Sequence, residues 1–302
     1  MTEVQNRNNR VKRLKKLILG TVVTAILIPI IACVILFIKV NELQKQVLQL
    51  SEASEMKFDE LSGIYTTSKV TSSEKGKNNS PEENTEKVEP DGIRKIYLTF
   101  DDGPSANTDR ILDILKEYDV KATFFVVGKT DEKSKERYQR IVDEGHTLGM
   151  HSYSHKYQEI YESKDTFAAD ISKLQEYLYE VTGVWPRIYR FPGGSSNQVS
   201  KVDMTELIQY LSDMGIVYYD WNIASGDAVS KILPSSTIVS NCLDKIDDYE
   251  ESVILLHDAT EKTTTVEALP QIIESILERE DAELLPITDD TVPIQHRVEA
   301  VN

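Results

Sequence analysis

Between Ile93 and Ile287 the sequence alternates between short apolar runs and amphipathic stretches, and this alternation limits the possible folds more than any other feature. The apolar runs predict strands, and the stretches between them carry apolar residues at helical spacing. Repeated strand–helix alternation is typical of a parallel sheet covered by helices. Seven such units predict an α/β fold, a distorted (β/α)7 barrel smaller or less complete than an eightfold one; an open, doubly wound sheet is the alternative.

The predicted strands are 95–100, 122–127, 147–151, 188–191, 216–221, 252–257 and 283–287. The predicted helices are 108–118, 132–144, 164–181, 204–214, 235–246 and 265–278. No glycine-rich phosphate loop follows the first predicted strand, which argues against a nucleotide site.

The chain that precedes this alternation predicts a membrane anchor. Residues 1–16 are basic, and residues 17–38 carry no charge. As a helix, such a stretch spans roughly 33 Å, about one hydrocarbon core. Basic flanks stay in the cytoplasm, so the chain after Lys39 is expected outside the cell. We therefore predict a cytoplasmic tail over 1–16, a single transmembrane anchor over 17–39 and localisation in the cell membrane.

Two forms of processing compete with a retained anchor. The apolar segment ends in large residues, 34–38, rather than in the small residues of a signal-peptidase site. Ile30-Ile31-Ala32-Cys33 resembles a bacterial lipoprotein box, although five more apolar residues follow Cys33. The sequence leaves retention, cleavage and lipidation at Cys33 open, with retention expected.

Residues 40–92 predict a short helical stalk and then a disordered linker. Leu43, Val47 and Leu50 fall at helical spacing, whereas residues 66–91 are almost without apolar side chains. A folded domain is expected over 93–289 and a tail over 290–302.

Composition excludes several partners and sites. With 50 acidic against 34 basic residues the net charge is −16, which argues against nucleic acid as a partner. The two cysteines, Cys33 and Cys242, provide neither a disulfide framework nor a thiolate metal site.

Polar side chains stand at the C-terminal ends of five predicted strands, where active sites of parallel α/β barrels assemble. These residues are Asp101 and Asp102, His151, Arg190, Asp220, and His257. Neighbouring carboxylates repel each other, so a fold that keeps both gives them different partners, for example a cation for one and a proton for the other.

His151 and His155 are four residues apart and, with one carboxylate, make a two-histidine, one-aspartate cation site. No Glu follows the first histidine, which excludes a zinc-protease helix. Taken alone, each motif has a simpler explanation: a solvated turn for the aspartates and a chance surface pair for the histidines. The two histidines outside these motifs, His146 and His296, are expected to be structural.

Five motifs follow one another in the order of a known family. They are TFDDGP at 99–104, HSYSH at 151–155, RFPGG at 190–194, DW at 220–221 and LLHD at 255–258. In these motifs the chain resembles the polysaccharide deacetylases of the NodB-homology family, carbohydrate esterase family 4. The resemblance covers roughly 93–287 and implies a distorted barrel of NodB type. Phe191 and Gly193 depart from the common Arg-Pro-Pro form of the third motif.

The resemblance also implies roles for the site residues. Asp102, His151 and His155 would hold one divalent ion, with Zn2+ expected and Co2+ as the alternative. Asp101 would be the general base.

The remaining roles concern the proton donor and the substrate. His257 would protonate the leaving amine, with Asp220 fixing its tautomer, and Arg190 would orient Asp101. The backbone N–H of Gly193 would be an oxyanion donor. Trp221 and Leu255 would line a pocket for the acetyl methyl group.

These features predict a metal-dependent hydrolase that removes N-acetyl groups from a cell-wall amino-sugar polymer, with N-acetylglucosamine of peptidoglycan the nearest candidate. The expected partners are a peptidoglycan or chitin-like glycan and the membrane, without nucleic acid or nucleotide. The enzymatic alternatives are an O-acetyl esterase and an N-acetylmuramic acid deacetylase. An inactive glycan-binding scaffold is disfavoured because both Asp101 and His257 are present.

Overall fold

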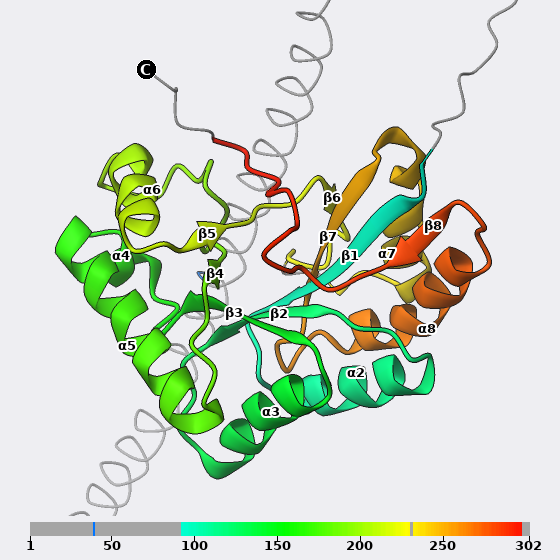
Figure 1. Ribbon diagram of the computed structural model, residues 1–302, viewed down its shortest axis with the longest axis horizontal. Helices are drawn as coiled ribbons and strands as arrows, with labels where there is room; N and C mark the ends of the chain where they lie inside the picture. The colour runs from blue at the N-terminus through cyan, green and yellow to red at the C-terminus, as the bar shows by residue number, and fades with distance from the viewer. Residues whose placement is uncertain (1–38, 40–91, 230–231, 298–302) are drawn as a thin grey trace, which may run out of the picture. The chain divides into compact units, whose positions relative to one another are not determined.

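The computed structural model describes Lys39, residues 92–229 and residues 232–297. The strands are β1 (Arg94–Asp101), β2 (Thr123–Val127), β3 (Thr147–Ser152), β4 (Ile188–Tyr189), β5 (Val217–Tyr218), β6 (Ile223–Ala224), β7 (Glu251–His257) and β8 (Ala282–Leu284). The helices are α2 (Ala106–Glu117), α3 (Glu132–Asp143), α4 (Tyr157–Ile160), α5 (Lys164–Thr182), α6 (Met204–Asp213), α7 (Ser235–Leu243), the 3-10 turn η1 (Ile246–Asp248) and α8 (Thr263–Leu277). Figure 1 shows the helices arranged around the outside of the strands.

The strands form a parallel sheet in the order β5-β4-β3-β2-β1-β7-β6. If the sheet is curled into a ring, its neighbouring strands follow one another in the order of the chain, and the ring is open between β5 and β6. Only residues 219–222 lie between these two edge strands, so the sheet must curl until its edges come close. The order is that of an incomplete barrel, and the doubly wound alternative is wrong. β8 pairs with the N-terminal half of β1.

Two apolar clusters lie on the two faces of the curled sheet. Side chains alternate along a strand, so Ile96 and Leu98 of β1 pack against the helices in the larger cluster, whereas Tyr97 belongs to a smaller one. The smaller cluster is the barrel interior, since strands, the residues after β5 and the C-terminal segment supply it. Its buried members are Tyr97, Phe125, Ile188, Tyr219, Val253 and Ile287.

The helix ends follow from local sequence. Ser105 caps α2 and Ser163 caps α5, each in a capping box with the threonine three residues later. Gly183 ends α5 in the left-handed conformation, with φ of 72°. These caps fix where the chain leaves each helix for the next strand.

Two differences from the predicted fold bear on the site. Strand β6 was not predicted, because its two residues are too few to show the apolar pattern of a strand. The predicted tail begins too early: Asp220 N–H donates to Ile294 O at 2.7 Å, so the chain beyond residue 290 is packed onto the barrel. In Figure 1 this segment runs from β8 back across the strands toward β5.

Most of the predicted anchor, and the stalk and linker up to residue 91, lie outside the described residues. Among the residues that are described, none belongs to a helix with the length and apolarity needed to cross a bilayer.

Candidate active site

The ends of β1 and β3 bring together the three side chains predicted to hold a metal. Oδ1 of Asp102 lies 3.0 Å from Nε2 of His155 and 3.5 Å from Nε2 of His151. One ligand atom from each residue lies within 4.8 Å of the others. Asp102 and His155 both adopt positive φ, 75° and 51°, a conformation that costs energy for residues other than glycine and is found at functional sites.

His151 is held in the tautomer that a metal ligand needs. Its Nδ1 lies 2.8 Å from Arg190 O, and because a carbonyl only accepts, Nδ1 carries the proton and Nε2 keeps its lone pair. Burial also lowers the pKa of His151, which outweighs the charges of Asp101 and Asp102. The imidazole is therefore neutral and available to a cation.

The electrostatics of Asp102 fit a cation. Burial alone would raise its pKa, but the contact with His155 and the charge of His155 hold the pKa of this carboxyl well below its usual range. Its Oδ1 is buried and has no well-aligned hydrogen-bond donor. An ionised, unsatisfied oxygen between two imidazole nitrogens matches the donor set of a Zn2+ site with open positions.

A side chain that sequence reasoning missed fixes the loop between the two histidines. Asp170 of α5 accepts from Ser152 Oγ at 2.7 Å, Tyr153 N at 2.7 Å and Ser154 N at 3.0 Å. Ser152 Oγ in turn accepts from His155 N at 2.9 Å. In the sequence Asp170 is only a polar residue of an amphipathic helix, so no local signal marks it.

Arg190 reaches Asp101 across the barrel interior. Its guanidinium is fully buried and donates to Asp101 Oδ1 at 2.9 Å and to Thr99 Oγ1 at 2.7 Å. It also donates to the carbonyls of Tyr219 at 3.0 Å and Asp220 at 2.9 Å. The arrangement leaves Asp101 Oδ2 on the metal side, 3.9 Å from His151 Nε2.

The partner of His257 differs from the prediction. Nδ1 of His257 lies 2.7 Å from Asp227 Oδ1, and its backbone N donates to Asp227 Oδ2 at 2.8 Å. Burial lowers the pKa of His257, but the hydrogen bond and charge of Asp227, with the charges of Asp101 and Asp102, raise it to about 9. Asp227 follows β6, the strand too short to predict, which is why the sequence analysis did not find it.

Asp220 therefore does not have the role expected of it. Its carboxylate accepts from Ser195 N at 2.8 Å, Ser195 Oγ at 2.5 Å and His296 N at 2.8 Å. Asp220 ties two loops together instead of holding His257.

The three predicted substrate contacts lie at different depths. Gly193 is exposed, and a Cβ there would meet the ring of Tyr157 at 3.3 Å; that ring packs edge-on against His155. The Trp221 ring lies edge-on to His296, with centroids 4.9 Å apart. Leu255 is buried in β7, in register with Thr99. Their oxyanion and methyl-pocket roles stay predictions.

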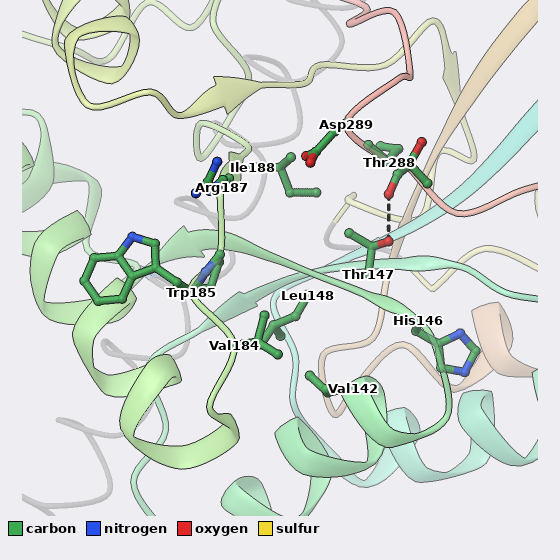
Figure 2. A pocket seen from close by; sticks show the side chains of 12 residues that line it. Val142, His146, Thr147, Leu148, Val184, Trp185, Arg187, Ile188, Thr288 and Asp289 are labelled. Atoms are coloured by element: carbon green, nitrogen blue, oxygen red, sulfur yellow. Dashed lines mark hydrogen bonds between the residues drawn. The ribbon is translucent and has the colours of Figure 1, made fainter.

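A separate pocket of about 450 Å³ lies near the N-terminal ends of β3 and β4, shown in Figure 2. Trp185 and Arg187 border it, and none of the predicted site residues lines it. His146, which also borders it, accepts from Ala122 N at 3.1 Å and packs edge-on against Phe124, consistent with a structural role.

The chain matches known proteins. Residues 89–217 match the family described as polysaccharide deacetylase. The protein YheN of Bacillus subtilis, named as a polysaccharide deacetylase, is 35% identical over 62% of this chain and 65% of its own length. A peptidoglycan-N-acetylglucosamine deacetylase of Bacillus cereus is 31% identical over 62% of this chain and 67% of its own length. The chain thus spans about two thirds of these two relatives.

A solved structure agrees with the fold. The catalytic domain of the peptidoglycan N-acetylglucosamine deacetylase from Eubacterium rectale superposes with a TM-score of 0.65 at 38% identity, covering 71% of this chain and 98% of that one. With the motifs of the family gathered at one end of the barrel, the chain belongs to the polysaccharide deacetylase family of hydrolases.

Proposed function

We propose that this protein is a metal-dependent deacetylase that removes N-acetyl groups from N-acetylglucosamine residues of peptidoglycan. The observation that carries the proposal is the convergence of an Asp–His–His cation site with a carboxylate, Asp101, and an imidazole, His257, on neighbouring strands. Asp101 and His257 are paired residues in the register of β1 and β7. The relatives named as peptidoglycan-N-acetylglucosamine deacetylases support the substrate.

Asp102, His151 and His155 would hold the ion, with Zn2+ expected. When bound, such an ion polarises the acyl carbonyl and lowers the pKa of water. The chain supplies the proton transfers. Asp101 accepts the proton of the attacking water, while Arg190 occupies its Oδ1 and keeps the carboxylate oriented.

His257 supplies the proton that the leaving amine needs. Because its pKa is raised to about 9, the imidazole is cationic at neutral pH. Asp227 accepts from Nδ1, so Nε2 is left as the proton donor. The base is thus oriented by an arginine and the acid by a carboxylate, so each proton-transfer group has a partner of opposite charge.

The test is acetate release by the purified protein with Zn2+ or Co2+ supplied. Peptidoglycan and N-acetylglucosamine oligomers should release acetate, and the products should lose one acetyl mass per site. An O-acetylated xylan and N-acetylmuramic acid substrates test the alternatives. Xylan is included because one relative, 32% identical over 60% of this chain, is named as a bifunctional xylanase/deacetylase. Binding of glycan without acetate release from any of them would contradict the proposal and favour the scaffold.

We also propose that residues 17–39 anchor the protein in the cell membrane with the catalytic domain outside, supported by the uncharged run 17–38 after a basic segment. Full-length protein should sediment with membranes and lose its domain to protease added outside intact cells, and a chain lacking 1–39 should not sediment. A Cys33→Ala chain that leaves the membrane would favour lipidation over a retained helix.

A further inference from the structure

The C-terminal strap, residues 285–297, follows β8 and bonds to β5 and to the residues after it, at the open edge of the sheet. We propose that this strap is a working part of the active site, and that His296 is a positioning residue that holds Trp221 and the 193–196 loop against the substrate. The proposal rests on the proposed function, because it assigns a role within the same site.

The strap is attached to the barrel along its whole length. Near its start, Leu285 N donates to Ile96 O at 2.9 Å and Ile287 N to Thr123 Oγ1 at 2.9 Å. Ile287 is fully buried in the barrel interior, and Ile294 packs against the same cluster. The strap therefore starts beside β1 and passes through the apolar interior before it reaches the site.

The second half of the strap bonds to β5 and to the residues that follow it. Tyr219 OH donates to Thr291 O at 3.0 Å, Asp220 N to Ile294 O at 2.7 Å, and Gln295 Nε2 to Tyr218 O at 3.1 Å. These bonds hold the backbone of residues 218–220. The carbonyls of Tyr219 and Asp220 in this stretch accept from Arg190, so the strap supports the segment that aims Arg190 at Asp101.

His296 joins the strap to two loops of the site, the one that carries Asp220 and Trp221 and the one that carries Ser196. Its backbone N donates to Asp220 Oδ2, its Nε2 lies 2.7 Å from Trp221 O, and its Nδ1 lies 3.3 Å from Ser196 Oγ. Since Trp221 O only accepts, Nε2 carries the proton. The ring also packs edge-on against Trp221. One side chain thus fixes both the wall at Trp221 and the loop that carries Gly193.

The exposure of these groups fits a substrate wall. His296 and Trp221 are half-buried, and Gly193 and Ser196 are exposed, so the surface that His296 organises is open to a ligand. Arg190, by contrast, has three other acceptors and does not depend on His296 directly. We therefore expect loss of His296 to act more on substrate binding than on the chemical step.

The experiment uses the full-length chain with His296→Ala. The expected result is a loss of kcat/KM of about tenfold, mainly through KM, with metal content unchanged. Partial unfolding would lower kcat in proportion to the folded fraction and leave KM as it is. Comparing the change in KM with the change in kcat therefore separates positioning from a merely structural effect. Val292→Ala is the matched control, because Val292 lies on the same strap with a side chain 63% exposed.

A second readout does not depend on activity. The chain has two tryptophans, so Trp185→Phe leaves Trp221 as the only one. In that background His296→Ala should increase acrylamide quenching of Trp221, and His296→Gln, which keeps a donor for Trp221 O but loses the ring, should fall between. If His296→Ala does not fold, His296→Gln decides by the same two measurements.

Unchanged KM and unchanged quenching in a folded His296 variant would overturn the role of His296. Wild-type protein without acetate release would instead contradict the proposed function. In that case only the quenching of Trp221 tests the positioning role of His296, and unchanged quenching in the His296 variants overturns that role.

Discussion

The two sides of the barrel are built in different ways. On one side, β1, β2, β3 and β7 are strands of five or more residues joined by ladders of three to seven paired residues, and they place Asp101, Asp102, His151 and His257. On the other, β4, β5 and β6 have two residues each, and side chains and the C-terminal strap do the work of a ladder. The long-strand side carries the metal site and both proton-transfer groups, and the short-strand side orients them.

This division shows how a barrel can leave part of its wall open. Arg190 donates to the backbone carbonyls of both Tyr219 and Asp220. The side chain of Asn222 donates to Glu251 O and accepts from Val253 N, both in β7. Such side-chain bonds are directional but few, so each matters more than one rung of a long ladder. Substitutions on the two sides should therefore differ in kind.

The largest effect is expected at the metal site of the long-strand side. Asp102→Ala or His155→Ala should lose bound Zn2+ and activity together, because each removes one of three ligands. Zinc content measured on the purified protein, with acetate release on the same sample, checks the two losses. Tyr161→Phe, outside the ligand set, is the control for folding and should keep its zinc. Full zinc in Asp102→Ala would place the ion elsewhere.

The next effect separates the two adjacent carboxylates. Asp101→Asn should keep the metal but lower kcat by about 10³-fold, since the amide cannot accept a proton. Arg190 keeps three other acceptors, so the fold should tolerate the change. Single-turnover acetate release and zinc content are the measurements. Loss of zinc here, with zinc kept in Asp102→Ala, would show the two aspartates in exchanged roles.

A smaller effect tests the short-strand side through its hold on His257. An acid catalyst works below its pKa, so activity should fall as the pH rises through about 9. Asp227→Asn should move this alkaline limb down toward 6.5, the ordinary pKa of histidine, because it removes the largest of the charges that raise the pKa. The measurement is kcat/KM against pH.

The matched control is Asp220→Asn, which removes a buried charge that does not touch His257. It should lower activity through the Ser195 loop but leave the alkaline limb where it is. If the alkaline limb of kcat/KM moved in Asp220→Asn and stayed in Asp227→Asn, Asp220 and not Asp227 would be the partner of His257.

The smallest effect concerns stability alone. Asn222→Ala should lower the free energy of unfolding by about 1–3 kcal/mol, because it leaves partners on β7 without their bonds. Urea denaturation checks it. Gln209→Ala, at an exposed pair on α6, should stay within about 0.5 kcal/mol. Equal effects in the two variants would mean that the short-strand side does not depend on its side-chain bonds.

Much of the long-strand side could be predicted from the sequence. Apolar runs of five or six residues set β1, β2, β3 and β7, and their C-terminal ends located the carboxylates and histidines without any structure. The short-strand side could not be read in this way. Two-residue strands have no period, so β6 was missed. Asp227, three residues after it, was therefore missed as the partner of His257. His296 was assigned a structural role because it is a lone histidine in the predicted tail.

By itself, the sequence determined the alternation that makes a barrel and the residue types available for metal binding and proton transfer, because burial periods and chemical identity are local properties. Only the tertiary structure decided which carboxylate pairs with His257, that Asp170 supports the histidine loop, and that the chain beyond residue 290 returns to the site. Those contacts join residues distant in sequence, and their partners are chosen by how the sheet curls and not by any neighbouring residue.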